Sequence, residues 1–165
     1  LNALAEVKKR GYDSRAVQMV VTGDFPESAW HMAQGLGVDG MIHLHPHVPY
    51  QQIGAVMNAA DLLVLLIQPR GRQRLAAKLF DYLASDRPIL AVSENAELGR
   101  LLADSGAGEM FGYAQFDAIA SAIVAEIGKG RQRAIARTPT GVTSAEAAAQ
   151  LAGILDAVTA KTSES

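Results

Sequence analysis

The chain has 165 residues, enough for one domain with a full hydrophobic core. Its charged residues make up 19% and its net charge is −2, so no overall positive field favours nucleic acid or an anionic membrane as a partner. The absence of cysteine excludes disulfides, thiolate nucleophiles and thiolate metal ligands, and suits a reducing compartment such as the cytoplasm.

Short apolar runs alternate along the chain with amphipathic stretches of helical length, a pattern typical of βαβ units. In chain order we expect a helix over 1–10, a strand over 16–22, a helix over 26–36, a strand over 41–45, a helix over 50–59 and a strand over 62–67. A polar loop (68–74), a helix (75–84), a strand (88–93), a helix (95–104), a strand (108–112) and a helix (117–127) follow. Residues 129–142 are interpreted as a surface linker and 144–159 as a closing helix.

This order predicts an α/β fold: a doubly wound, Rossmann-like parallel sheet with helices on both faces. We expect one domain over 1–165, with its core in 1–128 and a linker and C-terminal helix in 129–165. In such sheets ligands bind beyond the carboxyl ends of the strands. Those ends fall at 23–25, 46–49, 68–74 and 93–97.

Gly35, Gly37 and Gly40 match the dinucleotide-binding pattern G-x-G-x-x-G. That pattern binds pyrophosphate only where it follows a strand and opens a helix. Here it closes a predicted helix and precedes a strand, so the glycines are interpreted as a helix end and a turn. No nicotinamide cofactor is therefore expected.

His43, His45 and His47 alternate, and on one strand they would share a face. Pro46 interrupts that strand, and no nearby carboxylate or cysteine completes a metal site. We interpret them as histidines at the end of a strand and expect no metal. His47 keeps interest because it follows a strand end.

The segment 68–91 carries the strongest chemical signal. Arginines in a turn, followed by the unpaired amides of a helix N-terminus, form an anion site suited to phosphate. On the following helix, Lys78, Asp81 and Tyr82 lie at positions i, i+3 and i+4, so their side chains share one face. The lysine on that face can reach a diphosphate, and the carboxylate can accept hydrogen bonds from the two hydroxyls of a ribose. An ordinary Lys–Asp ion pair on a solvated face remains the alternative. The residues concerned are Arg70, Arg72, Arg74, Lys78, Asp81 and Tyr82.

Five blocks of sequence resemble, in order, the C-terminal domain of family-four glycosyltransferases, which have the two-domain GT-B fold. The most specific block is KLFDYLA (78–84) followed by RPILA (87–91). The others are VVTGD (20–24), IHLHPHVP (42–49), MNAADLLV (57–64) and Ala107-Gly108, and the similarity spans about residues 4–127.

The resemblance implies that Asp81 holds the ribose hydroxyls, that Lys78 and the amides near Leu75 and Ala76 face the diphosphate, and that the backbone at His47 and Val48 faces the base. The family has glutamates where this chain has Gln73 and Asp81, which puts recognition of the sugar in doubt. The predicted nucleotide-sugar site comprises Gly23, His47, Val48, Gln73, Arg74, Lys78, Asp81 and Tyr82. No catalytic residue is assigned, and a nucleotide-sugar would be substrate, not cofactor.

The function implied is transfer of a sugar from a UDP- or GDP-sugar to an acceptor in bacterial polysaccharide or glycolipid synthesis. The resemblance implies that the acceptor domain precedes Leu1, together with one more strand of the donor domain and a Lys/Arg pair that neutralises the leaving diphosphate. Without that strand and those cations, this chain alone should bind donor weakly and transfer nothing. We expect a cytoplasmic protein, with any peripheral contact to the inner membrane face, or to a membrane acceptor, made through that domain. The alternatives are a nucleotide-sugar 2-epimerase, a non-catalytic nucleotide-binding module and a receiver-like signalling domain.

Overall fold

The computed structural model describes residues 1–67, 78, 79, 81–85 and 87–133. Helices and strands alternate: α1 (Asn2–Lys9), β1 (Met19–Thr22), α2 (Glu27–Gly35), β2 (Ile42–His45), α3 (Tyr50–Ala59), β3 (Leu63–Leu66), β4 (Ile89–Val92), α5 (Ala96–Asp104), β5 (Gly108–Phe111) and α6 (Phe116–Arg133). Residues 78, 79 and 81–83 are helical, and a 3-10 turn, η1 (Asp39–Met41), precedes β2. The predicted loop 68–74 and the closing helix 144–159 lie outside the described residues.

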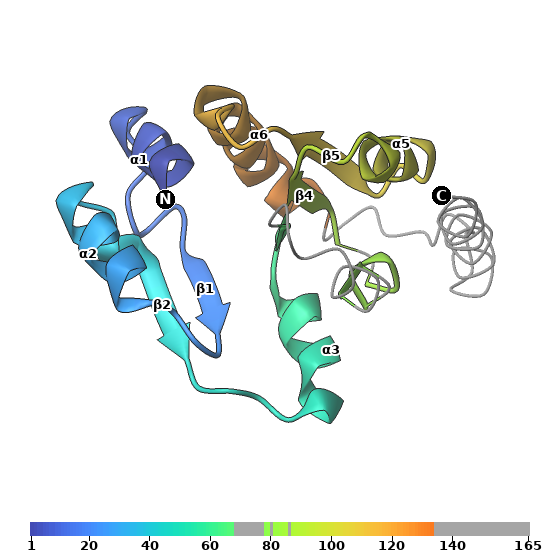
Figure 1. Cartoon of the computed structure of the whole chain (residues 1–165), viewed down its shortest axis with the longest axis horizontal. Helices are drawn as coiled ribbons and strands as arrows, with labels where there is room; N and C mark the ends of the chain where they lie inside the picture. Colours follow the sequence, from blue (N-terminus) through green and yellow to red (C-terminus); the bar gives the residue numbers. More distant parts are fainter. Residues whose placement is uncertain (68–77, 80, 86, 134–165) are drawn as a thin grey trace, which may run out of the picture.

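All strand pairs are parallel, which confirms the α/β class predicted from the alternating pattern. The strands, however, form two sheets instead of the single predicted sheet: β1 pairs with β2, and the other sheet has the order β3-β4-β5. Figure 1 shows β1 and β2 beside α1 and α2, whereas β4 and β5 lie with α5 and α6 on the other side. The described residues therefore show an α/β fold with two small parallel sheets, and the single doubly wound sheet stays a prediction.

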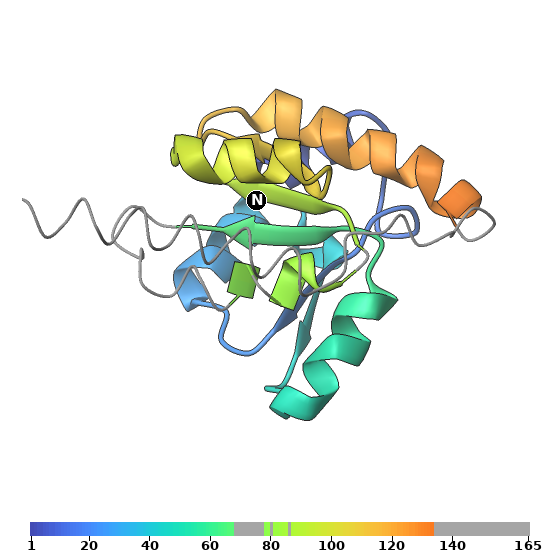
Figure 2. The same ribbon diagram turned by 90° about the vertical axis from the view of Figure 1, so that its right-hand side faces the viewer.

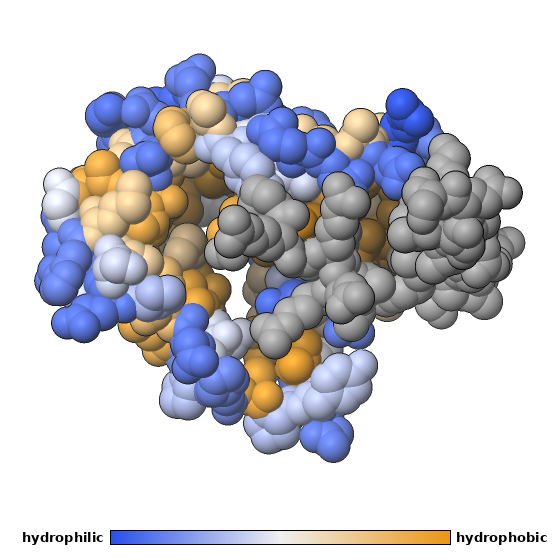
Figure 3. All heavy atoms as spheres, in the orientation of Figure 1, coloured by the Kyte–Doolittle hydropathy of each residue, from blue (hydrophilic) through white to orange (hydrophobic). Residues whose placement is uncertain are grey.

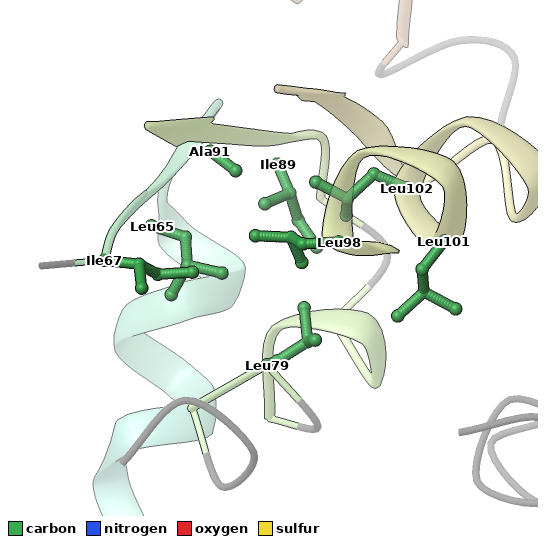
Figure 4. Close-up of a cluster of buried hydrophobic side chains, with 8 residues drawn as sticks. All are labelled: Leu65, Ile67, Leu79, Ile89, Ala91, Leu98, Leu101 and Leu102. Atoms are coloured by element: carbon green, nitrogen blue, oxygen red, sulfur yellow. The ribbon is translucent and has the colours of Figure 1, made fainter. Parts of the chain in front are cut away.

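Strand β4 is covered on both faces, as a central parallel strand should be. Ile89 and Ala91 point into a cluster with leucines of α5 and with Leu79 (Figure 4). Leu90 and Val92 point the other way, toward Ile119 of α6. Helices therefore lie on opposite faces of the three-stranded sheet, with α6 running along one of them (Figure 2).

Helices α1 and α6 join the two sheets on one face. Ala3 of α1 packs with Leu90 and Ile119, while the next turns of α1 pack beneath β1 and β2. Arg10, just after α1, donates hydrogen bonds to Asp117 and Ser121 of α6. Helix α1 buries Val7 completely in the cluster beneath β1 and β2, and it packs Ala3 against Leu90 and Ile119. It therefore connects the two-stranded sheet to the three-stranded sheet.

Local contacts explain where elements begin and end. The backbone carbonyl of Asp13 accepts from Ala16 and Val17, forming a turn that delays the first strand to Met19 instead of residue 16. Asn95 caps α5, as its side chain accepts from the amides of Glu97 and Leu98. Helix α6 runs to Arg133 through residues predicted as a linker.

Large apolar side chains on the strands are exposed where the sheets stop. Val20 is 53% exposed, Val64 48% and Leu66 64%. Orange, hydrophobic atoms are visible between the two groups of elements in the space-filling view (Figure 3). No helix in the described ranges has the length and apolar character needed to span a membrane.

Candidate functional site

Gly23 and His47 follow the ends of β1 and β2, and the structure brings them together. The amide of Gly23 donates to the carbonyl of His45 at 3.0 Å. A Cβ added at Gly23 would lie 2.8 Å from His47 Cε1, and its φ is +98°, so both space and backbone conformation require glycine. His47 Nε2 also lies 3.5 Å from an oxygen of Asp24, and both side chains are mostly exposed.

Asp81 lies beside the first residue of α3. The hydroxyl of Tyr50 donates to Asp81 Oδ1 at 3.4 Å. Tyr50 stands two residues after Val48, so this contact joins the segment predicted to face the base to the carboxylate predicted to face the ribose. These two predicted parts of the site are more than 30 residues apart in the chain and adjacent in space. Sequence reasoning did not single out Tyr50, although its place directly after Pro49 was a signal.

Helix α3 is held mainly by polar contacts. None of its residues is buried, and in both ribbon views it projects away from the strands (Figures 1 and 2). At its far end, Arg87 donates from Nη2 to the carbonyl of Asn58. Arg87 Nε is buried and has no hydrogen-bond partner among the described residues. Tyr50 and Arg87 therefore attach the two ends of α3 to the chain segment that contains Asp81.

Lys78 and Tyr82 point to different surroundings, although the predicted spacing places both near Asp81. Lys78 is exposed. The Tyr82 ring packs with Leu79 against the core of the three-stranded sheet, and its hydroxyl donates to the carbonyl of Val64 at 3.4 Å. Burial, followed by the negative charge of Asp81, raises the pKa of Tyr82. No ion pair joins Lys78 to Asp81, although both residues are described.

A second polar group ties together the ends of β3, β4 and β5. The amide of Tyr113 donates to Glu94 Oε1 at 3.1 Å, and the Tyr113 hydroxyl donates to the carbonyl of Ile67. A Cβ at Gly112 would lie 2.7 Å from the same Glu94 oxygen, so the close approach needs glycine. Buried Ser93 accepts from the amide of Asn95. The sequence analysis expected a ligand-facing edge at 93–97 but did not single out Glu94 or Tyr113.

The predicted residues Gln73 and Arg74 lie outside the described residues. Val48 is half-buried. Within the described ranges no three His, Cys, Asp or Glu side chains gather in a way that could hold a metal ion. An open hollow of about 730 Å³ lies elsewhere, between α1, the end of α2 and Phe116, and none of the predicted site residues lines it.

The glycine pattern at 35–40 occurs as the sequence analysis interpreted it. Gly35 ends α2, Gly37 has a φ of +66°, and Gly40 lies in η1 just before β2. No helix N-terminus follows this pattern to receive a pyrophosphate. Comparison with known proteins adds no assignment: no protein-family model matches the chain, and no curated protein matches its sequence.

Proposed function

We propose that this chain is the donor-binding domain of a glycosyltransferase that takes its sugar from a nucleoside diphosphate. The observation that supports this most is the contact of Tyr50 with Asp81, because it gathers the predicted base-facing and ribose-facing parts at one place. Gly23 and His47, in contact at the ends of β1 and β2, supply a neighbouring polar rim.

Each group has a defined task in this proposal. The carboxylate of Asp81 accepts hydrogen bonds from the two ribose hydroxyls, since an ionised carboxylate offers about four lone-pair positions. The exposed ammonium of Lys78 attracts the diphosphate. In the complete enzyme, the bond between the sugar and the diphosphate breaks, a bond to the acceptor oxygen forms, and the acceptor hydroxyl loses its proton. Stabilising the departing diphosphate is the main electrostatic task.

The two sheets fit the proposal as halves of one doubly wound sheet. The Rossmann strand order is 3-2-1-4-5-6, in which helices before and after the central strand lie on opposite faces. The observed orders β2-β1 and β3-β4-β5 correspond to 3-2 and 4-5-6 if an additional strand lies between β1 and β3 and precedes α1 in the chain. In that order the inner edges of β1 and β3 are the two that would receive the added strand.

The face pattern agrees with this order. Helices α1 and α6 cover one face of β4, and α5 together with Leu79 covers its opposite face. An added central strand would lie between β1 and β3. These two strands carry the exposed side chains of Val20, Val64 and Leu66. Such exposure is unusual, because parallel sheets are normally buried on both faces. A segment joined to Leu1 would enter beside α1, as a right-handed crossover requires.

Calorimetric titration of the chain with UDP and with GDP tests the proposed binding. We expect one of them to bind weakly, with a dissociation constant on the order of 1 mM or below. Asp81→Asn should weaken binding at least about tenfold, because it replaces a charged acceptor with a neutral amide. Asp104→Asn, an exposed carboxylate at the end of α5, is the matched control and should leave affinity unchanged. Equal affinity of wild type and Asp81→Asn would reject the proposal.

A further inference from the structure

We infer that Tyr50 is a positioning residue for recognition of the ribose, acting through Asp81. The inference rests on the proposed function, since it assigns Asp81 to the ribose. It adds a residue that neither the sequence pattern nor the resemblance indicated. The hydroxyl of Tyr50 donates a hydrogen bond to Asp81 Oδ1, and this contact supports the inference.

The chemistry of the carboxylate makes such a partner useful. The terminal torsion of an aspartate is broad, so an unrestrained carboxylate samples many orientations. A hydrogen bond to Oδ1 fixes the plane of the group and leaves Oδ2, together with the second lone pair of Oδ1, for two neighbouring hydroxyls. Tyr50 therefore prepares the acceptor geometry that a ribose needs before the ligand arrives.

The surroundings of Tyr50 argue against a purely structural role. Its side chain is 72% exposed and belongs to none of the hydrophobic clusters formed by the described residues. A tyrosine kept for packing would bury its ring. Here the ring lies open and the hydroxyl supplies the recorded contact, so removal of the oxygen alone should carry the effect.

The test compares Tyr50→Phe, which keeps the ring, with the control Tyr12→Phe. Tyr12 is half-buried and packs against the cluster of apolar side chains between α1, α2 and β2. Each variant is titrated with UDP and with 2′,3′-dideoxy-UDP, or with the guanine pair if GDP binds better. We expect Tyr50→Phe to weaken UDP binding about three- to tenfold. Binding of the dideoxy nucleotide should change less than about twofold, because that ligand has no hydroxyl for Asp81 to accept. Tyr12→Phe should bind both ligands like wild type.

The outcomes separate the inference from the proposed function. Equal weakening of both ligands would show that Tyr50 acts by placing α3, which overturns the role in ribose recognition. Unchanged UDP binding in Tyr50→Phe, with weakened binding in Asp81→Asn, overturns the inference and leaves the proposed function standing. Unchanged binding in Asp81→Asn overturns both.

Discussion

The unpaired inner edges of β1 and β3 lead to a distance that can be measured. Neighbouring strands lie about 4.8 Å apart, so one strand between β1 and β3 separates their backbones by about 10 Å. Direct pairing of β1 with β3 would bring them within about 5 Å. Thr22 and Leu66 end their strands at the carboxyl side and are both exposed, which makes them suitable reporters.

The perturbation is the double variant Thr22→Cys, Leu66→Cys in an extended chain that includes the added strand. The 165 residues contain no cysteine, so within them the two introduced thiols are the sole sites of cross-linking. A disulfide requires Cα atoms within about 7 Å, so it should not form across an intervening strand. A bis-maleimide that spans about 10 Å should link the pair efficiently, as electrophoresis after cleavage between the two sites will show.

Two results would refute the added strand. Rapid disulfide formation under mild oxidation would place β1 directly beside β3. Absence of both cross-links in the extended chain would mean that the two strands are not flanking a common neighbour. Hydrogen exchange supplies an independent reading: β1 and β3 amides should gain at least about tenfold protection in the extended chain relative to the 165-residue chain.

Other expectations concern stability and are measured by urea unfolding. Leu102→Ala, at a fully buried site of α5, should lower the free energy of unfolding by about 3 kcal/mol, whereas Leu66→Ala should change it by less than about 0.5 kcal/mol; equal losses would contradict the burial pattern. Because the folded pKa of Tyr82 is raised above its ordinary 10.0, its contribution is complete below pH 10.0 and is lost as pH rises through the folded value. Wild type should therefore lose stability more steeply than Tyr82→Phe as the pH rises above 10.0, and parallel curves would argue against that cause. Gly23→Ala should cost at least about 1 kcal/mol because of its positive φ and the contact with His47, whereas Gly35→Ala, which meets nothing within 4 Å, should be neutral or stabilising.

The elements could be predicted well from sequence because their signals are local. The apolar run at 62–67 became β3, and the stretch 50–59 became α3 with the same bounds. Asn95 capped α5 because its side-chain oxygen accepts from the following amides wherever the helix lies. Such features depend on a few neighbouring residues, so no knowledge of the rest of the fold is needed.

Sheet continuity could not be predicted in this way. The alternation of strands and helices gives the order along the chain, whereas sheet assembly depends on which edges meet. Every strand expected within residues 1–133 is present, yet β1 and β3 lack a shared neighbour in the described structure. The alternation of strands and helices reports only the strands that these residues form, so a further strand could be expected from the family resemblance alone.

Tyr82 and Asp81 show why helical spacing alone could not predict the orientation of neighbouring side chains. Spacing of i, i+3 and i+4 grouped Lys78, Asp81 and Tyr82, but Tyr82 is also three residues after Leu79. Leu79 is buried against the sheet, so the helix turns Tyr82 toward the core and directs its hydroxyl to Val64. A side chain at the border of two helix faces points toward the face that buries more apolar surface. Which face this is depends on the helices and strands that pack against the helix.

Asp81, one residue earlier, then lies at the border between the core face and solvent. A carboxylate in that place is open to ligands, and among the described residues of this helix Lys78 makes no ion pair with it. The partner comes instead from α3, through Tyr50. No residue of α3 is buried, and its far end is also attached by the hydrogen bond from Arg87 to the carbonyl of Asn58, so loss of the Tyr50 oxygen alone leaves α3 held at that end. Ribose recognition should therefore weaken alone when only the Tyr50 oxygen is removed, whereas ribose and base recognition should weaken together when α3 itself is displaced.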